Sequence, residues 1–318
     1  MRQLSPHFRP YDWAISTAEA ARIAGIRPDQ VLRFEANTSP GPPEAARPAT
    51  VSEALGHVYG YPHGGYPELV AAIAEYARVE PENVVLGAGA DDLILLAART
   101  FAGPGDRVAI VNEPTYPLYR VAAWLTGAEV GSESPAVTFC CRPHNPTGAL
   151  NEIPAARPLV VDEAYFEYCG ETAALLGDVV AIRTLSKAFA LAGARVGYAL
   201  AQPELARALN ARQAPAPIST LSAALALAAL AEPPDVGGLL EERERLAARL
   251  REVGLEPLPS AANFLYVPFE RAPELGELLL GAAMVVRAYP DAIRVTVLDP
   301  ASNERLVAGL GGFLERLT

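Results

Sequence analysis

The chain is poor in lysine, cysteine and histidine and carries an excess of negative charge. Of its 26 basic residues, only Lys187 is a lysine. The three cysteines, Cys140, Cys141 and Cys169, form no Cys-x-x-Cys pair, which argues against a zinc site or a disulfide framework. The four histidines are scattered, so we expect no metal centre. A net charge of −11 argues against a protein that coats nucleic acid or an anionic membrane.

Long hydrophobic runs are also missing. The longest apolar stretch, residues 221–231, is too short to cross a bilayer, and the first residues lack the apolar core of a signal peptide. We therefore expect a cytoplasmic protein without membrane contact. A composition of 51% hydrophobic and 20% charged residues is typical of globular proteins, and 318 residues suffice for one large domain or two ordinary ones.

Short apolar strands alternate with helices through the first two thirds of the chain. We expect strands at 84–87, 108–111, 137–141, 159–161, 179–182 and 196–200, and helices at 67–77, 91–101 and 116–125. Apolar strands between helices indicate a mostly parallel central sheet covered on both faces, which is an α/β fold.

The two ends of the chain differ from this pattern. Residues 1–45 are rich in proline and are predicted to be irregular, and helices dominate residues 203–253. Further strands are expected at 264–267, 284–287 and 293–297, after a hinge at Pro233-Pro234. We therefore predict a large cofactor-binding domain at 44–232 and a smaller α/β domain formed by 1–43 and 233–318.

Polar residues follow four of the predicted strands. They are the glycines and acids of Gly87–Asp92, then Asn145 between two prolines, then Asp162, and finally Ser186 with Lys187. Taken singly, they fit a tight turn, an Asn-Pro turn or a helix cap. Ligands of parallel sheets bind where strands end, so the four are expected to meet. An anion cradle, an aimed amide, a buried carboxylate and a nucleophilic lysine together suit pyridoxal phosphate.

The chain also resembles a known family, the fold-type-I pyridoxal-phosphate aminotransferases, and within it the histidinol-phosphate aminotransferase-like branch. The resemblance covers most of the chain. The motifs that carry it are Glu35-Ala36-Asn37, Tyr61-Pro62, Gly89-Ala90-Asp91, Pro114-Thr115-Tyr116-Pro117, Asn145-Pro146-Thr147-Gly148, Asp162-Glu163-Ala164-Tyr165, Thr184-Leu185-Ser186-Lys187, Gly193-Ala194-Arg195, Ala262-Asn263-Phe264 and Ile293-Arg294-Val295-Thr296.

The resemblance implies roles around the cofactor ring. Lys187 resembles the lysine that holds the cofactor covalently, a role that a guanidinium cannot take. Asp162 resembles the carboxylate that keeps the ring nitrogen protonated, and Tyr116 resembles the aromatic residue stacked on the ring. Asn145 and Tyr165 resemble the pair that hydrogen-bonds the ring oxygen. Lys187, Asp162 and Tyr116 are therefore the predicted catalytic residues.

The resemblance also implies a phosphate site. It consists of the backbone N–H groups of Ala90 and Asp91, the hydroxyl of Ser186, the guanidinium of Arg195 and, as an additional contact, Thr184.

Other residues are assigned to the substrate and the partner subunit. Tyr61 resembles a tyrosine that reaches the phosphate of the neighbouring subunit, which implies a homodimer with shared active sites. Arg294 resembles the clamp for the substrate carboxylate. Arg287 resembles an arginine used for a distal phosphate, with a surface strand residue as the alternative, and Asn37 is also assigned to the substrate.

The implied activity is transfer of an amino group from an amino acid or amine, with histidinol phosphate as the first candidate, to a 2-oxo acid such as 2-oxoglutarate. Departures from the family surround the substrate: Thr38 and Ser39 stand where an acid and an asparagine are usual, and the segments near 131–137, 149–158 and 288–293 are short. A decarboxylase of the same fold, similar to threonine-phosphate decarboxylases, and a non-catalytic cofactor-binding protein are the alternatives.

Overall fold

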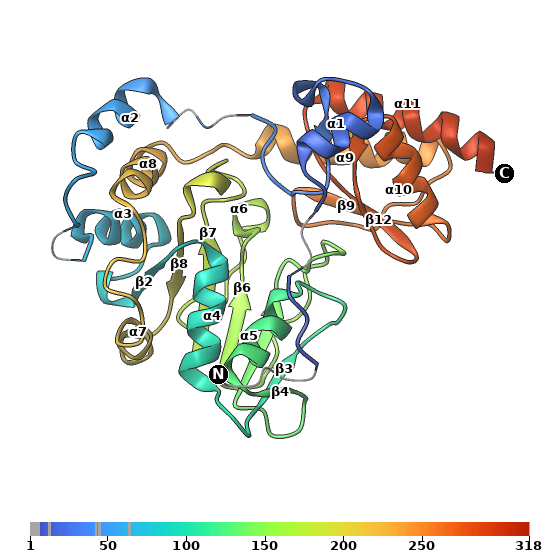
Figure 1. Ribbon diagram of the computed structural model, residues 1–318. Helices are drawn as coiled ribbons and strands as arrows, with labels where there is room; N and C mark the ends of the chain where they lie inside the picture. The colour runs from blue at the N-terminus through green and yellow to red at the C-terminus, as the bar shows by residue number, and fades with distance from the viewer. Residues whose placement is uncertain (1–6, 12–13, 42, 44–45, 63–64, 318) are drawn as a thin grey trace. The chain divides into compact units, whose positions relative to one another are not determined.

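The computed structural model describes residues 7–11, 14–41, 43, 46–62 and 65–317 and divides into two compact units (Figure 1). Unit 1 comprises Met1–Tyr11, Gly41–His144 and Asn151–Pro234; unit 2 comprises Asp12–Pro40, Asn145–Leu150 and Asp235–Thr318. These bounds differ from the predicted domain bounds at the N-terminus, where residues 1–11 join unit 1, and at residues 145–150, which join unit 2.

Unit 1 is built on a seven-stranded sheet in the order β2-β8-β7-β6-β5-β3-β4. The strands are β2 (Val84–Gly87), β3 (Arg107–Ile110), β4 (Glu129–Val130), β5 (Val137–Cys141), β6 (Leu159–Asp162), β7 (Val179–Thr184) and β8 (Gly197–Leu200). Only β8 runs antiparallel to its neighbours. The predicted α/β class with a mostly parallel sheet is therefore confirmed.

The strand register brings several strand ends to one edge of this sheet. Cys141 at the end of β5 is opposite Asp162 at the end of β6. Gly197 at the start of β8 is opposite both Gly87 at the end of β2 and Thr184 at the end of β7. The segments that follow β2, β5, β6 and β7 therefore leave the sheet at the same edge, where ligands of such sheets bind.

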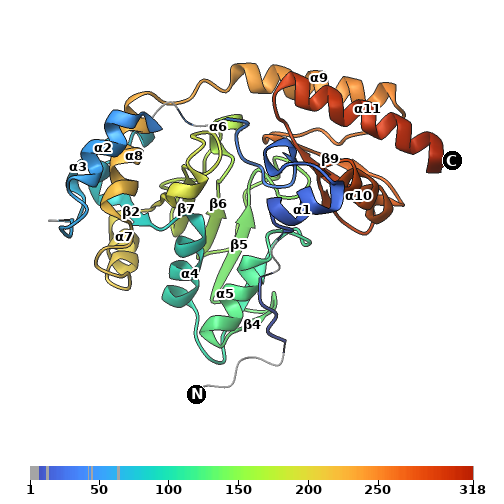
Figure 2. The same ribbon diagram turned by 45° about the horizontal axis from the view of Figure 1, so that its top comes forward.

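Helices pack around this sheet. α4 (Ala90–Phe101) and α5 (Leu118–Thr126) lie side by side against the sheet, as Figure 2 shows. A second group consists of α2 (Pro48–Leu55), α3 (Pro67–Ala77) and α8 (Thr220–Ala231), with α6 (Phe166–Cys169) and α7 (Pro203–Asn210) completing the unit. None of the helices among the described residues combines the length and the apolar character needed to cross a bilayer.

Three of the differences from the predictions have identifiable physical reasons. The supposedly irregular N-terminal region contains α1 (Thr17–Ala24), which Ser16 caps by accepting the N–H of Glu19. β7 extends two residues beyond the predicted end, because its last two polar side chains are buried and paired. α5 begins at Leu118 rather than at Tyr116, since a residue that precedes proline disfavours the helical conformation. Residues 149–158 form no helix, in agreement with the shortened segment.

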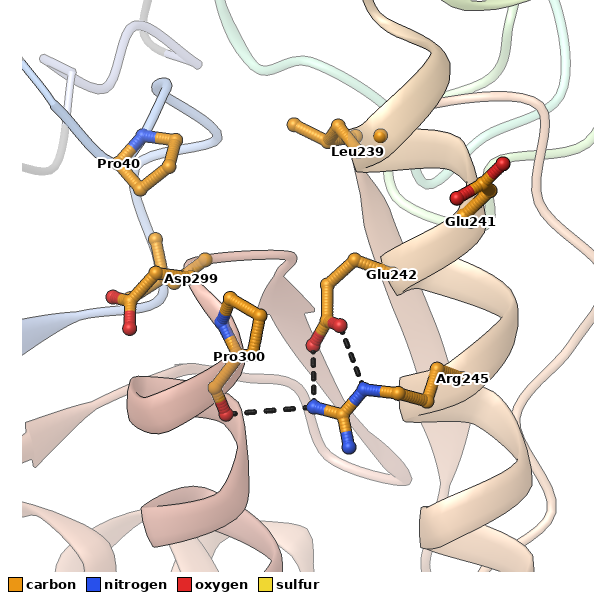
Figure 3. Close-up of a pocket in the computed structure, with 9 residues that line it drawn as sticks. Pro40, Leu239, Glu241, Glu242, Arg245, Asp299 and Pro300 are labelled. Carbon is orange, nitrogen blue, oxygen red and sulfur yellow. Dashed lines mark hydrogen bonds and ion pairs between the residues drawn. The ribbon is translucent and has the colours of Figure 1, made fainter.

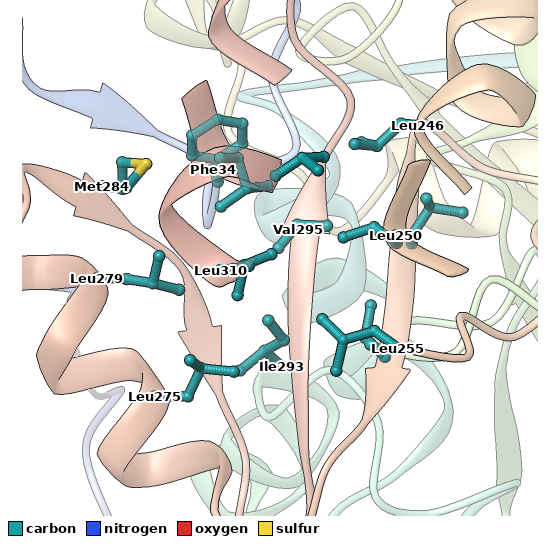
Figure 4. Packing of buried hydrophobic residues seen from close by; sticks show 14 of the residues in the cluster. Phe34, Leu246, Leu250, Leu255, Leu275, Leu279, Met284, Ile293, Val295 and Leu310 are labelled. Atoms are coloured by element: carbon teal, nitrogen blue, oxygen red, sulfur yellow. The ribbon is translucent and has the colours of Figure 1, made fainter. Parts of the chain in front are cut away.

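Unit 2 contains two small sheets and three long helices. β11 (Arg287–Ala288), β12 (Ala292–Thr296) and β9 (Phe264–Pro268) form an antiparallel sheet, and β1 (Leu32–Arg33) pairs in parallel with β10 (Met284–Val285). The predicted strand 284–287 is therefore two strands. The helices are α9 (Gly237–Glu252), α10 (Ala272–Gly281) and α11 (Pro300–Leu317). Phe34 from the N-terminal segment joins the leucines of these helices in one hydrophobic core (Figure 4).

A shallow cavity of about 530 Å³ lies in unit 2, where α9 and α11 begin (Figure 3). The carboxylate of Glu242 accepts hydrogen bonds from Arg245 at 2.7 Å and from Asn303 at 2.7 Å. Arg245 also donates to the backbone oxygen of Pro300. These side chains are engaged with one another, so they connect the two helices.

Candidate active site

Asp162 is a buried acid at the sheet edge of unit 1. It ends β6 and is 4% exposed. One carboxylate oxygen, Oδ1, accepts the N–H of Ala164 at 3.1 Å, and the other, Oδ2, accepts the hydroxyl of Tyr119 at 2.6 Å. Burial raises the pKa of this carboxyl from its usual value near 3.8 to about 6, although both hydrogen bonds and the charge of Lys187 act in the opposite direction. The site therefore holds a carboxylate that lacks solvation.

The junction between β2 and α4 has the shape of an anion cradle. Gly89 caps α4 with φ +83°, a conformation that side chains rarely adopt, and a Cβ there would lie 2.5 Å from Nη2 of Arg195. A Cβ on Gly197 would lie 2.6 Å from the carbonyl carbon of Gly89 and 2.8 Å from the nitrogen of Ala90. Gly197 is therefore needed for the close approach of β8 to the start of α4, and Gly89 is needed for its positive φ. Backbone N–H groups at such a helix start form an anion site.

Asp91 links two of the predicted site residues. Its Oδ1 accepts the hydroxyl of Tyr116 at 2.9 Å, and its Oδ2 pairs with Nη2 of Arg195 at 2.9 Å. Arg195 and Asp91 are both nearly half exposed. Burial, followed by the charge of Asp91, raises the pKa of the Tyr116 phenol, so this hydroxyl remains a donor at neutral pH. The structure thus joins Asp91, Tyr116 and Arg195 in one cluster.

The segment that follows β7 carries the remaining residues of unit 1. Thr184 donates its hydroxyl to Oγ of Ser186 at 2.8 Å and accepts the N–H of Ser186 at 3.1 Å. Both residues are buried. Nζ of Lys187 lies 5.9 Å from the centre of the Tyr165 ring, which places the amine over an aromatic face. Thr184, Ser186, Lys187 and Tyr165 therefore lie in one part of unit 1.

Asn145, Arg294 and Asn37 belong to unit 2. Oδ1 of Asn145 accepts from Nη1 of Arg294 at 2.5 Å, while Nη2 of Arg294 donates to the backbone oxygen of Glu35 at 2.5 Å. Nε of Arg294 is buried and has no hydrogen-bond partner among the described residues. The N–H of Asn37 donates to Thr296 at 2.9 Å. Arg294 is thus held in place by two hydrogen bonds, and its Nε–H remains without a partner among the described residues.

Two other predicted residues lie at less enclosed positions. Arg287 of β11 is opposite Arg294 in the strand register and is partly exposed, so the two guanidinium groups come from adjacent strands. Tyr61 of unit 1 is 85% exposed.

Sequence reasoning missed two features of the site. Tyr119 is fully buried and bonds Asp162, but its position three residues after Tyr116 suggests only a core aromatic. Glu163 and Arg183 form a fully buried ion pair at 2.9 Å that joins the end of β6 to the end of β7. An arginine in an apolar strand next to an Asp-Glu pair was the available signal for this contact.

The arrangement suits covalent chemistry on an amine or carbonyl compound that carries a phosphate. It offers an amine, a buried acid, an aromatic face and an anion cradle along one sheet edge. Among the residues that the structure describes, no three His, Cys, Asp or Glu side chains are grouped as a metal site would require.

Comparisons with known proteins identify the family. The Aminotransferase class I and II family matches residues 29–134 and 131–310. A histidinol-phosphate aminotransferase of Carboxydothermus hydrogenoformans is 32% identical over 100% of this chain and 100% of its own length. An aromatic amino acid aminotransferase of Corynebacterium efficiens is 30% identical over 90% of this chain and 94% of its own length.

Solved structures agree with this fold. The histidinol-phosphate aminotransferase of Sinorhizobium meliloti, solved in complex with pyridoxal-5'-phosphate, superposes with a TM-score of 0.84 at 24% identity and covers 99% of each chain. Both the family match and the relatives of at least 30% identity span nearly the whole chain. The chain belongs to the class I and II aminotransferases, in the histidinol-phosphate aminotransferase-like branch.

Proposed function

We propose that this aminotransferase uses pyridoxal 5'-phosphate to move an amino group from an amino acid or amine to a 2-oxo acid such as 2-oxoglutarate. Histidinol phosphate is the first donor to test, because a relative that matches over its whole length bears that name. Aromatic amino acids come next, since a second relative is named for them. A decarboxylase is not favoured, because both of these relatives are aminotransferases.

The observation that carries the proposal is the meeting of Asp162 and Lys187 at one sheet edge. β6 and β7 are parallel neighbours, so the buried acid that ends β6 and the amine that follows β7 leave the sheet together. A buried carboxylate is costly unless a positive group approaches it. The protonated ring nitrogen of pyridoxal phosphate is such a group, and the amine is the cofactor's covalent partner.

The cradle fits the other end of the cofactor. A phosphate would meet the N–H groups of Ala90 and Asp91 at the start of α4, the hydroxyls of Ser186 and Thr184, and the fork of Arg195. Arg195 pairs with Asp91 at 2.9 Å, so its guanidinium is already held beside the start of the helix. We assign cofactor binding mainly to unit 1, most of which falls in the predicted domain 44–232.

Each residue of the site then has a separate role in the proposed reaction. The bound cofactor supplies an electron-withdrawing ring that stabilises the negative charge left at the substrate α-carbon. With the cofactor bound, Lys187 Nζ would be the base that takes the proton from the substrate α-carbon and the acid that donates it again. Tyr116 would cover the ring, Tyr165 and Asn145 would hydrogen-bond its oxygen, and Asp162 would hold the proton at its nitrogen.

Arg294 orients the substrate in this scheme. Its guanidinium is fixed by Asn145 and by the backbone of Glu35, and its remaining N–H groups, that of Nε among them, would be the donors to a carboxylate. Asn37 lies in the same unit and contacts Thr296 of the strand that carries Arg294. We also assign Arg287, on the adjacent strand, to an anionic group at the far end of the donor.

We further propose a homodimer. The surface formed by residues 55–61 exposes four large apolar side chains: Leu55 at 53%, Val58 at 58%, Tyr59 at 90% and Tyr61 at 85%. Several exposed large apolar side chains in one short segment favour an interface. Through it, Tyr61 would reach the phosphate of the partner subunit. Light scattering should give twice the mass of 33.6 kDa, and Tyr59→Glu should lower it.

A cytoplasmic, biosynthetic role follows from the same proposal. None of the three cysteines takes part in a disulfide, and two of them are buried. Cysteines without disulfides are typical of a reducing compartment, in which amino acids and 2-oxo acids are also metabolised.

The single lysine makes the test direct. After loading with pyridoxal phosphate and reduction with borohydride, mass spectrometry should find the cofactor on the peptide that contains Lys187. The Lys187→Ala variant should lose both the visible absorption band and turnover. The donor screen then adds histidinol phosphate or an aromatic amino acid with 2-oxoglutarate, and measures glutamate and carbon dioxide. A protein that stays colourless with cofactor, or that releases carbon dioxide without glutamate, would refute the proposal.

A further inference from the structure

Tyr119 occupies a position that the proposed chemistry does not yet use. It is fully buried in the first turn of α5, and its hydroxyl donates to Oδ2 of Asp162 at 2.6 Å. Its ring stacks on Phe139 of β5, with centres 5.4 Å apart and planes 20° apart. The ring of Tyr116 meets it edge-on at 5.7 Å. Tyr119 therefore contacts both the residue proposed to cover the cofactor ring and the acid proposed to hold its nitrogen.

The surroundings leave Tyr119 little freedom. The stack on Phe139 fixes the ring plane, and full burial removes water as a competing partner for the hydroxyl. Cys141, which is opposite Asp162 in the strand register, is the other polar group near that hydroxyl. Burial and the charge of Asp162 raise the pKa of the Tyr119 phenol far above its usual value, so the phenol keeps its proton and acts as a donor.

The second oxygen of Asp162 is also fixed. Oδ1 accepts the N–H of Ala164, so each carboxylate oxygen has one donor from the protein. A hydrogen bond to the charged form of a carboxyl favours that form. The other charged or titratable groups that act on Asp162 or on its phenol partner include Asp91 of α4, Tyr116, Lys187 after β7, and Cys140 and Cys141 of β5.

We propose that Tyr119 is a positioning residue of the aminotransferase reaction: its hydroxyl aims Asp162 and keeps it ionised, so that the proton between Asp162 and the cofactor stays on the ring nitrogen. This inference rests on the proposed function. The ring withdraws electrons most strongly when its nitrogen is protonated, so Tyr119 supports catalysis without touching substrate or cofactor.

The test uses Tyr119→Phe, which keeps the stacked ring and removes only the hydroxyl. Tyr76→Phe is the matched control, because the Tyr76 hydroxyl donates to a different carboxylate of unit 1, that of Glu167, at 3.4 Å. In cofactor-free protein, an infrared titration measures the pH at which Asp162 loses its proton. The carboxyl band of Asp162 is identified as the band that is absent from the spectrum of Asp162→Asn. Tyr119→Phe should raise the proton affinity of Asp162 about tenfold, the effect of losing one hydrogen bond to the charged form. Tyr76→Phe should leave it unchanged.

The loaded enzyme gives a second readout. With cofactor labelled at the ring nitrogen, nitrogen NMR should find the ring protonated in wild type and Tyr76→Phe at neutral pH and partly deprotonated in Tyr119→Phe. The kcat of Tyr119→Phe should fall about tenfold or more, while the KM for the donor should change less than about twofold. An unchanged infrared midpoint, or a ring that stays fully protonated in Tyr119→Phe, overturns the proposal.

Failure of the proposed function can be distinguished from failure of the inference about Tyr119. A wild-type protein that takes up no cofactor refutes the proposed function, and the infrared titration then still decides whether Tyr119 governs Asp162. If Tyr119→Phe does not fold, proton NMR of wild type decides instead: a low-field hydroxyl signal that disappears in Asp162→Asn supports the contact, and its absence from wild type contradicts it.

Discussion

Asp162 should make the cofactor-free protein less stable as the pH rises. Its folded-state pKa is about 6, against a usual value near 3.8. Between these values the unfolded chain has already released the proton that the folded protein still holds. The stabilising contribution is therefore complete below about pH 3.8 and is lost as the pH rises through about 6. Two units at 1.36 kcal/mol each correspond to a loss of about 3 kcal/mol.

The substitution that isolates this effect is Asp162→Asn, which cannot titrate. Other carboxyl groups also contribute to the pH dependence, but they do so equally in both proteins. The quantity to measure is thus the free energy of unfolding of wild type minus that of the variant, from urea titrations at pH 4.5 to 7.5. We expect this difference to fall by about 2 kcal/mol over that range, because part of the titration lies below pH 4.5.

Adding the cofactor supplies the control. A protonated ring nitrogen next to Asp162 favours the ionised carboxylate, so the pH-dependent difference should shrink or vanish in the loaded protein. A difference that stays flat from pH 4.5 to 7.5 without cofactor would refute the reasoning, because Asp162 would then titrate at its ordinary pKa in spite of its burial.

Three further changes test other parts of the site. Gly197→Ala should weaken cofactor binding about tenfold or more by calorimetry, since its Cβ would press on the start of α4; Gly193→Ala, with nothing within 4 Å, should not. Glu163→Ala should cost about 3–5 kcal/mol in urea unfolding, because it leaves the buried guanidinium of Arg183 unpaired; an unchanged midpoint contradicts this. Arg294→Lys should raise the KM for 2-oxoglutarate about tenfold or more without altering the cofactor absorption band; an equal loss of cofactor would place Arg294 elsewhere in the mechanism.

The sheet of unit 1 could be predicted well from the sequence because its strands are apolar throughout. β2 and β5 have the predicted bounds, Val84–Gly87 and Val137–Cys141. β7 was predicted too short because hydropathy treats Arg183 and Thr184 as surface residues, whereas ion pairing and hydrogen bonding allow both to be buried. Polar residues that pair with each other are invisible to a pattern that scores each residue alone.

The helix α1 had local sequence signals, but the surrounding prolines outweighed them in the prediction. The sequence contains the signals that bound α1: Ser16 as N-cap, Glu19 three residues later and Gly25 as C-cap. In the structure, Gly25 has the left-handed φ of +67° that such a C-cap needs. The proline-rich stretches around α1 led to the prediction that the whole N-terminal region has no regular secondary structure. The Tyr119–Asp162 contact had no local signal, because it depends on how α5 lies against β5 and β6.

The scarcity of lysine and the buried acid can be understood together. Arginine serves in buried and exposed ion pairs alike, and it suits them because its fixed fork and permanent charge need no particular pH. Those same properties prevent it from acting as a nucleophile or carrying a proton back and forth. In the proposed function, Lys187 is therefore the basic position at which a neutral amine would be required. Asp162 would be the complementary case, because burial favours its neutral form while the proposed cofactor would require its charged form. The proposed reaction would thus depend on two groups that stability alone does not select, and the contact with Tyr119 would favour the charged form of Asp162.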